Sequence, residues 1–131
     1  MGGFSDYWEN KILDHIFGKG GYTPPTIYVG LSTADPTDDG SGLAEPSGNA
    51  YARVQTSASD WNAASNGSLE NASDIIFDQA TGSWGTITHF ALFDAATAGN
   101  MLAHGALIQS KDIGDSDTAR FEAGDLDINL D

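Results

Sequence analysis

The sequence has no cysteine and few basic residues. Only 5 Lys plus Arg stand against 19 Asp plus Glu, which gives a formal net charge of −14. Without cysteine the chain can form no disulfide, no Cys-based zinc or iron–sulfur site and no thiol nucleophile. Duplex nucleic acid is a poor partner, because neutralising phosphates requires clustered lysine and arginine side chains. The fold must therefore rest on its own hydrophobic core.

Long apolar runs are also missing. No stretch approaches the roughly 20 residues that cross a bilayer, and the N-terminal sequence MGGFSDYWENK lacks the basic start and the hydrophobic segment of a signal peptide. We therefore expect no membrane association, and synthesis in a cytoplasm.

What is present is enough for a folded domain. Hydrophobic residues make up 40% of the 131 residues and aromatic residues 10%, which is too much for a disordered acidic tail. A chain of this length can bury roughly 70% of its unfolded surface without disulfides. We expect a single domain over residues 1–131.

One amphipathic helix is predicted over residues 6–17. Its apolar residues recur at steps of three and four, and Trp8, Ile12 and Ile16 are expected to form the buried stripe. Asp6 and Glu9 fit a capping box at the start of the helix. The glycines at 18, 20 and 21 predict its end.

The rest of the chain predicts strands and loops. Strand-like runs occupy residues 26–33, 51–56, 75–78, 85–95, 101–110 and 119–130. The run at 85–95 is apolar on both faces, which predicts a central strand. Residues 34–50 are expected to form a long exposed loop and a candidate arm, and residues 57–74 a polar linker with a tight turn at Asn66-Gly67. The predicted fold is mainly β: an antiparallel β-sandwich or small barrel of about six to eight strands over residues 26–131, with one N-terminal α-helix.

No pattern of catalytic residues stands out. His15, His89 and His104 are spaced unlike known metal-binding or general-base pairs, and no G-x-S-x-G stretch offers a serine nucleophile. Close pairs of carboxylates arise by chance among so many acids. We expect no enzymatic activity and no cofactor.

Two acidic clusters invite a comparison with calcium sites. Asp35, Asp38 and Asp39 form one, and Asp112, Asp115 and Asp117 form the other. Neither matches the spacing of a calcium-binding loop, so solvated loops are the favoured interpretation over a cation site.

The aromatic residues suggest a contact surface. We expect 13 aromatic side chains to exceed what the core of so small a domain consumes, and the surplus to serve subunit contacts or, alternatively, sugar stacking. A helix of about three turns is marginally stable alone, so its apolar face must dock. We predict partner binding by Tyr7, Trp8, Ile12 and Ile16, and a homo-oligomer, with a trimer favoured.

Several stretches of the sequence resemble small virion proteins of tailed bacteriophages, known as head decoration or tail fibre-like proteins. They are SDYWENKILDHIFGKGGYTPPTIYVGLSTADP, YAR, WGTITHFALFDAATAGNMLAHGAL and FEAGDLDINLD, in this order and over nearly the whole chain. The resemblance implies a structural role on a phage particle and carries over no catalytic residue.

Within that role, a capsid decoration protein on the outside of the major capsid shell is the favoured interpretation. The sequence shows neither the repeats nor the coiled-coil heptads of a fibre shaft, and a compact acidic domain suits many copies on a shell. Two alternatives remain: a tail, collar or fibre-base component that contacts the host surface, and a carbohydrate-binding module. The expected partners are the major capsid protein or other virion proteins, and the expected location is the virion, assembled in the bacterial cytoplasm.

Overall fold

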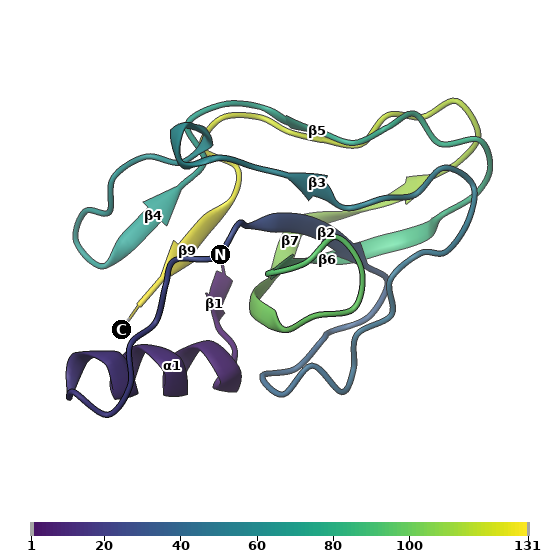
Figure 1. The fold of residues 1–131 in the computed structure, drawn as a ribbon. Coiled ribbons are helices and arrows are strands. Elements are labelled where there is room, and N and C mark those ends of the chain that lie inside the picture. Colours follow the sequence, from purple (N-terminus) through teal and green to yellow (C-terminus); the bar gives the residue numbers. More distant parts are fainter. Residues whose placement is uncertain (1, 131) are drawn as a thin grey trace.

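The computed structural model describes residues 2–130 (Figure 1). Its helix is α1 (Asp6–Ile16), followed later by a short 3-10 helix, η1 (Ala58–Asp60). The strands are β1 (Gly2–Phe4), β2 (Tyr28–Ser32), β3 (Val54–Gln55), β4 (Ser68–Glu70), β5 (Ile75–Ile76), β6 (Gly85–Phe93), β7 (Met101–Ile113), β8 (Arg120–Phe121) and β9 (Asp127–Asn129). The prediction of a mainly β fold with one N-terminal α-helix is confirmed.

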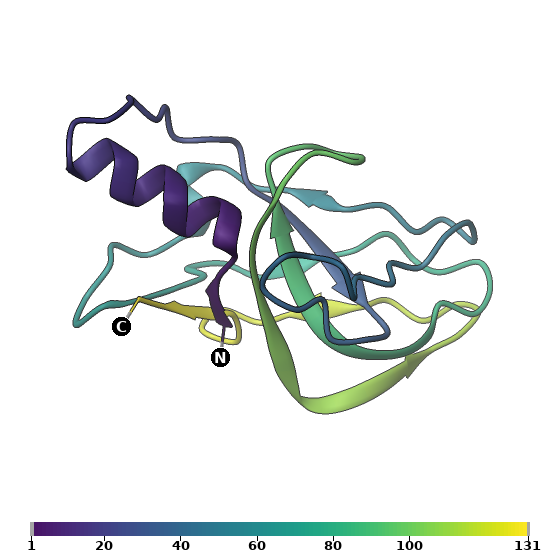
Figure 2. The ribbon, with the colours of Figure 1, turned by 90° about the horizontal axis from the view of Figure 1, so that it is seen from below.

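The strands form a curled sheet and a small second sheet (Figures 1 and 2). The large sheet has the order β3-β2-β6-β7-β1-β9-β4, and β5 pairs with β8. One pairing departs from the predicted antiparallel pattern, because β1 and β9 run parallel. The run at 119–130 is also two strands in two different sheets, because the chain turns through residues 122–126 between them.

The core lies between the curled sheet and the small sheet. Leu31 and Phe90 from the large sheet pack in one cluster with Ile75 and Phe77 from the other side. Strand β6 lies between β2 and β7, so the prediction of a central strand is confirmed. A bulge between Ile87 and His89 interrupts its alternation and places Ile87 in the same core as Phe90.

The N-terminal strand β1 was not predicted. It is inserted between β7 and β9, although two of its three residues are glycine. A Cβ at Gly2 would lie 2.7 Å from Phe90 Cζ and 3.0 Å from Ile128 Cδ1. Glycine therefore fits here because the backbone passes directly over core side chains.

The helix begins at Asp6 as predicted, but its N-cap lies one residue earlier than the predicted cap. Ser5 is the N-cap: its hydroxyl accepts a hydrogen bond from the Trp8 N–H and donates one to the Met101 carbonyl. The predicted capping box of Asp6 and Glu9 is therefore wrong. At the other end the glycine stop is confirmed, since Phe17 caps the helix and Gly18 has a φ of +73°.

The two long connections are more ordered than predicted. Residues 34–50 contain no strand, but Pro36 is buried, and the Ala44 carbonyl accepts from the Thr33 N–H. The prediction of a long exposed loop is confirmed, because most of these residues are exposed and none lies in a strand, but the loop folds back along the sheet and forms no projecting arm. In the linker, Asn66 and Gly67 have φ values of 54° and 75°, which confirms the predicted tight turn.

Residues 2–130 include no helix with the length and apolar character that a bilayer span requires.

Candidate functional site

The four residues predicted to bind a partner do not form one continuous surface. Tyr7 is half-buried beside a hollow that Asp38 and Arg53 also line, whereas Trp8 packs on Phe4 with ring centroids 4.5 Å apart. Ile12 is half-buried. Ile16 remains 67% exposed, so the stripe that was predicted to be buried along the whole helix stops short of its last turn.

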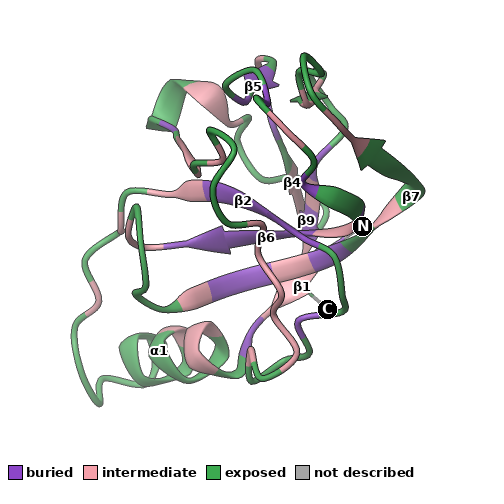
Figure 3. Ribbon diagram, turned by 90° about the vertical axis from the view of Figure 1, so that its right-hand side faces the viewer, coloured by how far each residue is buried: buried purple, intermediate pink, exposed green. Residues whose placement is uncertain are grey.

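The reason lies in how α1 leaves the sheet. Its N-terminal end is fixed to β1 and β7, while the C-terminal end projects away from the β-structure (Figure 2). Most of the helix is consequently exposed (Figure 3). Periodicity identified the face of the helix correctly, but the body beneath that face ends before Ile16.

The projecting part of the helix carries a cluster of exposed apolar side chains. Leu13 is 54% exposed, Ile16 67% and Phe17 73%. We name these three residues the helix end. Single exposed apolar side chains are common on proteins, but three within one turn form a patch that water solvates poorly.

Beside the helix lies an apolar hollow of about 560 Å³. Phe4 and Trp8 contribute to it from the N-terminal segment, and its floor reaches the core residues Leu92 and Ile128. Other lining residues are Pro24, Ile27, Trp61 and Leu69. We name this hollow the aromatic groove.

The prediction that the core would leave many aromatic side chains exposed is wrong. Of the 13 aromatic side chains only Phe17 is exposed, and the others are buried or half-buried. Ring packing explains this, because Tyr51, Phe77 and Trp84 contact one another within the core. The exposed large apolar side chains are mostly aliphatic instead.

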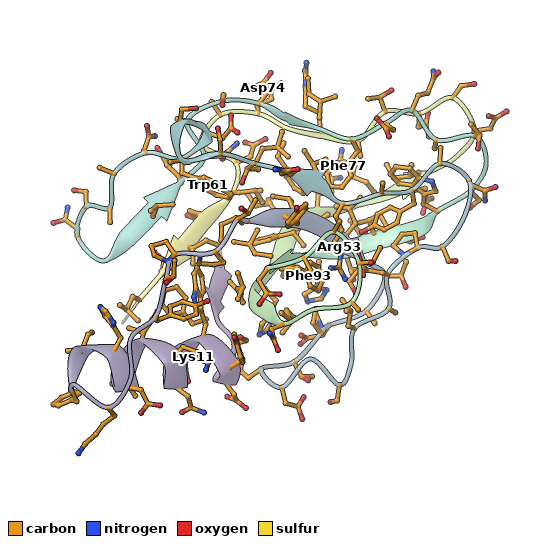
Figure 4. All side chains as sticks on the ribbon, viewed as in Figure 1. Lys11, Arg53, Trp61, Asp74, Phe77 and Phe93 are labelled. Atoms are coloured by element: carbon orange, nitrogen blue, oxygen red, sulfur yellow. The ribbon has the colours of Figure 1, made fainter. Side chains whose placement is uncertain are left out.

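The strongest polar arrangement lies under the loop of residues 34–50, and sequence reasoning missed it. Arg53 donates to both carboxylate oxygens of Glu45, at 2.7 and 2.9 Å, and to the carbonyls of Ala95 and Ala98. Its guanidinium lies 3.4 Å from the centroid of the Phe93 ring (Figure 4). The Arg53 side chain is only 5% exposed.

Tyr51 completes this cluster. Its hydroxyl donates to Glu45 at 2.6 Å and accepts from the Leu31 N–H at 3.0 Å. Burial, and then the hydrogen bond to Glu45, raise the pKa of Tyr51, so the phenol stays protonated. A Cβ at Gly30 would lie within 3.0 Å of Phe93, Glu45 and Tyr51, so glycine makes room for the cluster. The sequence offered one signal of this cluster. Arg53 lies in a predicted strand of a very acidic chain, yet no acidic residue stands next to it.

Two histidines lie on the same face of the sheet. His104 Nε2 is 2.9 Å from Asp38 Oδ1, and Asp35 Oδ1 lies 3.9 Å from His104 and 4.0 Å from His89. His89 Nδ1 is also 2.8 Å from the Thr88 hydroxyl. Both imidazoles thus contact the loop of residues 34–50, and they help to hold it on the sheet. His15 instead accepts a hydrogen bond from the Tyr22 N–H.

The acidic clusters are used within the chain. Asp39 accepts from the Thr37 hydroxyl and from the Ser41 N–H, and these bonds lower its pKa to about 2. Asp117 accepts from the Gly114 N–H, and Asp112 from the Thr86 hydroxyl. Across residues 2–130, no three His, Asp or Glu side chains converge closely enough to hold a metal ion.

Comparison with known proteins places this fold in a phage protein family. The family described as podophage GP4 fiber I protein gp80 matches residues 3–129, which is nearly the whole chain. The chain belongs to this family, and a phage fibre family is a family of virion structural components. No curated protein matches the sequence.

Proposed function

We propose that this protein is a non-enzymatic structural component of a phage tail fibre or of its base. The observation that carries the proposal is the match to a phage fibre family over residues 3–129. Capsid decoration, which the sequence favoured, becomes the second candidate. What still favours it is the compact shape, because the described chain includes no extended shaft (Figure 1).

The polar clusters support a structural role. Arg53 makes four hydrogen bonds, to Glu45 and two carbonyls, and stacks on the Phe93 ring, so its charge and most of its donors are used within the chain. His89 and His104, the two histidines of the sheet, face carboxylates of the loop of residues 34–50. These are arrangements that fix a loop on a sheet, whereas a catalytic site needs groups directed at a ligand.

The partners that suit this surface are other virion proteins. An apolar groove next to an exposed apolar helix end offers area for a protein contact, and both lie away from the buried polar cluster. The protein would be made in the bacterial cytoplasm and incorporated into the virion there.

Fractionated virions test the proposal. Heads and tails of the phage that encodes the protein are separated and probed with an antibody against it. The fibre assignment predicts signal in the tail fraction alone. Signal on heads would support capsid decoration instead, and absence from both fractions would contradict a virion role.

A polysaccharide assay tests the non-enzymatic part. Purified protein is incubated with host surface polysaccharide, and the products are separated by size. We expect no cleavage. Cleavage that disappears in His89→Ala would contradict the proposal, while sugar binding without cleavage would favour the carbohydrate-binding alternative.

A further inference from the structure

We propose that Asn66 is a site of spontaneous deamidation, at which the side-chain amide is converted to an acid through a cyclic imide with the Gly67 nitrogen. The pair forms the turn directly before β4, and Asn-Gly occurs nowhere else in the 131 residues. The reaction needs only water as a co-reactant. It concerns the isolated chain, so it does not depend on the proposed place in the virion.

The chemistry joins two neighbouring groups of the main chain and side chain. The Gly67 nitrogen, after losing its proton to hydroxide, attacks the side-chain carbonyl carbon of Asn66. A new N–C bond forms, the amide nitrogen takes a proton from water, and ammonia leaves. Water then opens the five-membered imide at either of its two carbonyls. One opening gives aspartate, and the other gives isoaspartate, in which the main chain runs through the Cβ atom.

The attacking nitrogen is not engaged elsewhere. The turn is closed by two hydrogen bonds, from the Ser65 N–H to the Ser68 carbonyl at 2.8 Å and from the Ser68 N–H to the Ser65 carbonyl at 3.0 Å. Neither bond uses the Gly67 N–H, which has no acceptor within residues 2–130. Gly67 is exposed to solvent, so hydroxide reaches this proton. Because glycine has no Cβ, nothing stands beside the nitrogen to hinder the attack.

The amide that is attacked is equally accessible. Asn66 is exposed, and its side chain makes no hydrogen bond to the described part of the chain. Its φ of 54° places it at the tip of the turn, where a short polar side chain tolerates the left-handed region. No hydrogen bond of the side chain therefore has to break before the amide rotates toward the Gly67 nitrogen.

Two other asparagines show what protects such a site. Asn71 is buried, its side chain donates to the carbonyls of Ser73 and Glu122, and the N–H of the next residue is also bonded. Asn62 is exposed, and its side chain makes no hydrogen bond within residues 2–130. Ala63 follows it, however, and places a Cβ beside the nitrogen that would attack. Asn62 is thus a matched control within the same chain.

The Asp39-Gly40 pair is the nearest relative of this site in the sequence, and the structure blocks it. The Gly40 N–H donates to the Thr37 carbonyl at 3.0 Å, so the nitrogen is engaged. The Asp39 side chain is held by the Ser41 N–H and the Thr37 hydroxyl. These bonds keep it ionised, and a carboxylate is a poor target for an attacking nitrogen. The free turn at Asn66 has neither restraint.

Isoaspartate at position 66 changes one end of the large sheet, where β4 and β9 lie side by side (Figure 1). It adds one atom to the main chain between Ser65 and Ser68, so the two hydrogen bonds of this tight turn no longer fit together. The Gly67 carbonyl also accepts from the Leu130 N–H at 2.7 Å. Gly67, Ser68 and Leu130 all line the aromatic groove. A modified copy therefore differs from a fresh one at this wall of the groove.

Storage of the purified full-length chain in mildly alkaline buffer tests the site. Samples are digested at intervals, and mass spectrometry with fragmentation measures the amide-to-acid conversion at each asparagine. A fresh sample, digested in parallel, corrects for conversion during the digestion. We expect Asn66 to convert at least about tenfold faster than Asn62, because glycine lacks the hindering Cβ. The rate should rise with pH, since hydroxide removes the N–H proton.

Two results would overturn the proposal. One is an equal rate at Asn66 and Asn62 in the folded protein. The other is an Asn66 that stays intact in the folded protein while the same chain, unfolded in urea, loses its amide, because the turn would then protect the site.

Two variants test the cause of the reactivity. Asn66→Gln should abolish conversion at this position, because the longer side chain would have to close a less favourable six-membered ring. Ala63→Gly should accelerate conversion at Asn62, since it removes the Cβ that distinguishes the two sites. An unchanged rate at Asn62 in Ala63→Gly would contradict this explanation.

A third variant separates the added charge from the added main-chain atom. Freshly prepared Asn66→Asp carries the extra negative charge of both products but keeps the normal backbone. We expect its melting temperature to stay close to that of the wild type, whereas the isoaspartate fraction of the stored protein, isolated by chromatography, should melt at a lower temperature. Equal melting temperatures for these two forms would contradict the effect on the turn.

Discussion

At the scale of single residues, Arg53 joins several segments of the structure. Its planar guanidinium satisfies both oxygens of Glu45 and two loop carbonyls while it stacks on Phe93. Lysine could supply the charge but neither the fork nor the stacking. One side chain from the edge of the sheet thereby holds both the loop of residues 34–50 and the turn of residues 94–100.

We expect Arg53→Ala to destabilise the fold by about 3–5 kcal/mol, because it leaves the carboxylate of Glu45 without its partner in a largely buried site. Urea denaturation monitored by tryptophan fluorescence measures this free energy. The control is Arg120→Ala, whose side chain is 50% exposed and pairs at the surface, so its cost should stay within about 1 kcal/mol. Similar values for both variants would contradict the role given to Arg53.

Asp39 gives a pH signature to the loop of residues 34–50. Hydrogen bonds from Ser41 and Thr37 lower its pKa from 3.8 to about 2. Because the folded pKa is the lower one, the stabilisation is fully present above pH 3.8 and is lost as the pH falls toward 2. Carboxyl NMR titration should show this low value for Asp39. A Ser41→Pro variant, which lacks the donating N–H, should move the pKa back upward, and an Asp39 pKa near 3.8 in the wild type would contradict the arrangement.

At the scale of elements, α1 is divided into a docked half and a free half. Ser5 and Trp8 fix its start to β7 and to Phe4, whereas its last turn has no protein beneath it. The two halves of α1 therefore differ in how much they contribute to stability. Substitutions at Trp8 and Ile16, which lie on the same face of the helix, can distinguish them.

We expect Trp8→Ala to cost about 2–3 kcal/mol of stability, less than for a fully buried tryptophan because Trp8 is half-buried. Ile16→Ala should change stability by no more than about 0.5 kcal/mol, because its side chain is exposed. Thermal denaturation of both variants measures the difference. Equal losses would mean that the last turn of α1 packs as firmly as the first.

The turn between residues 65 and 68 requires glycine at position 67. Gly67 has a φ of 75°, and a Cβ there would lie 2.8 Å from the Leu130 carbonyl oxygen. We expect Gly67→Ala to destabilise the protein by about 1–3 kcal/mol, from backbone strain and this close approach. Gly20→Ala, where a Cβ meets nothing within 4 Å, is the control that should cost little. Chemical denaturation compares the two, and no difference between them would contradict the strained turn.

The sequence indicated those elements whose signals are local. Three predictions depend only on short stretches of sequence, and all three are confirmed: the periodicity of α1, the apolar faces of β6 and the Asn66-Gly67 turn. Strand β1 could not be predicted, because its partners in β7 and β9 lie about 100 and about 126 residues further along the chain and it shows no β pattern of its own. The Arg53 cluster and the exposure of Ile16 likewise depend on where distant segments end in space.

At the scale of the whole molecule, the fold combines a closed interior with exposed apolar surface. The polar clusters are satisfied internally, while the helix end and the aromatic groove offer area for a partner. This division suits a building block that repeats in a larger particle. The match to a phage fibre family over residues 3–129 identifies the kind of particle.

The most direct test of the central claim is a cryo-electron microscopy reconstruction of the virion at a resolution that separates strands. We expect density for the curled sheet and its projecting helix within the tail fibre or at its base. Density for this fold on the capsid lattice alone, or nowhere on the particle, would contradict the fibre assignment.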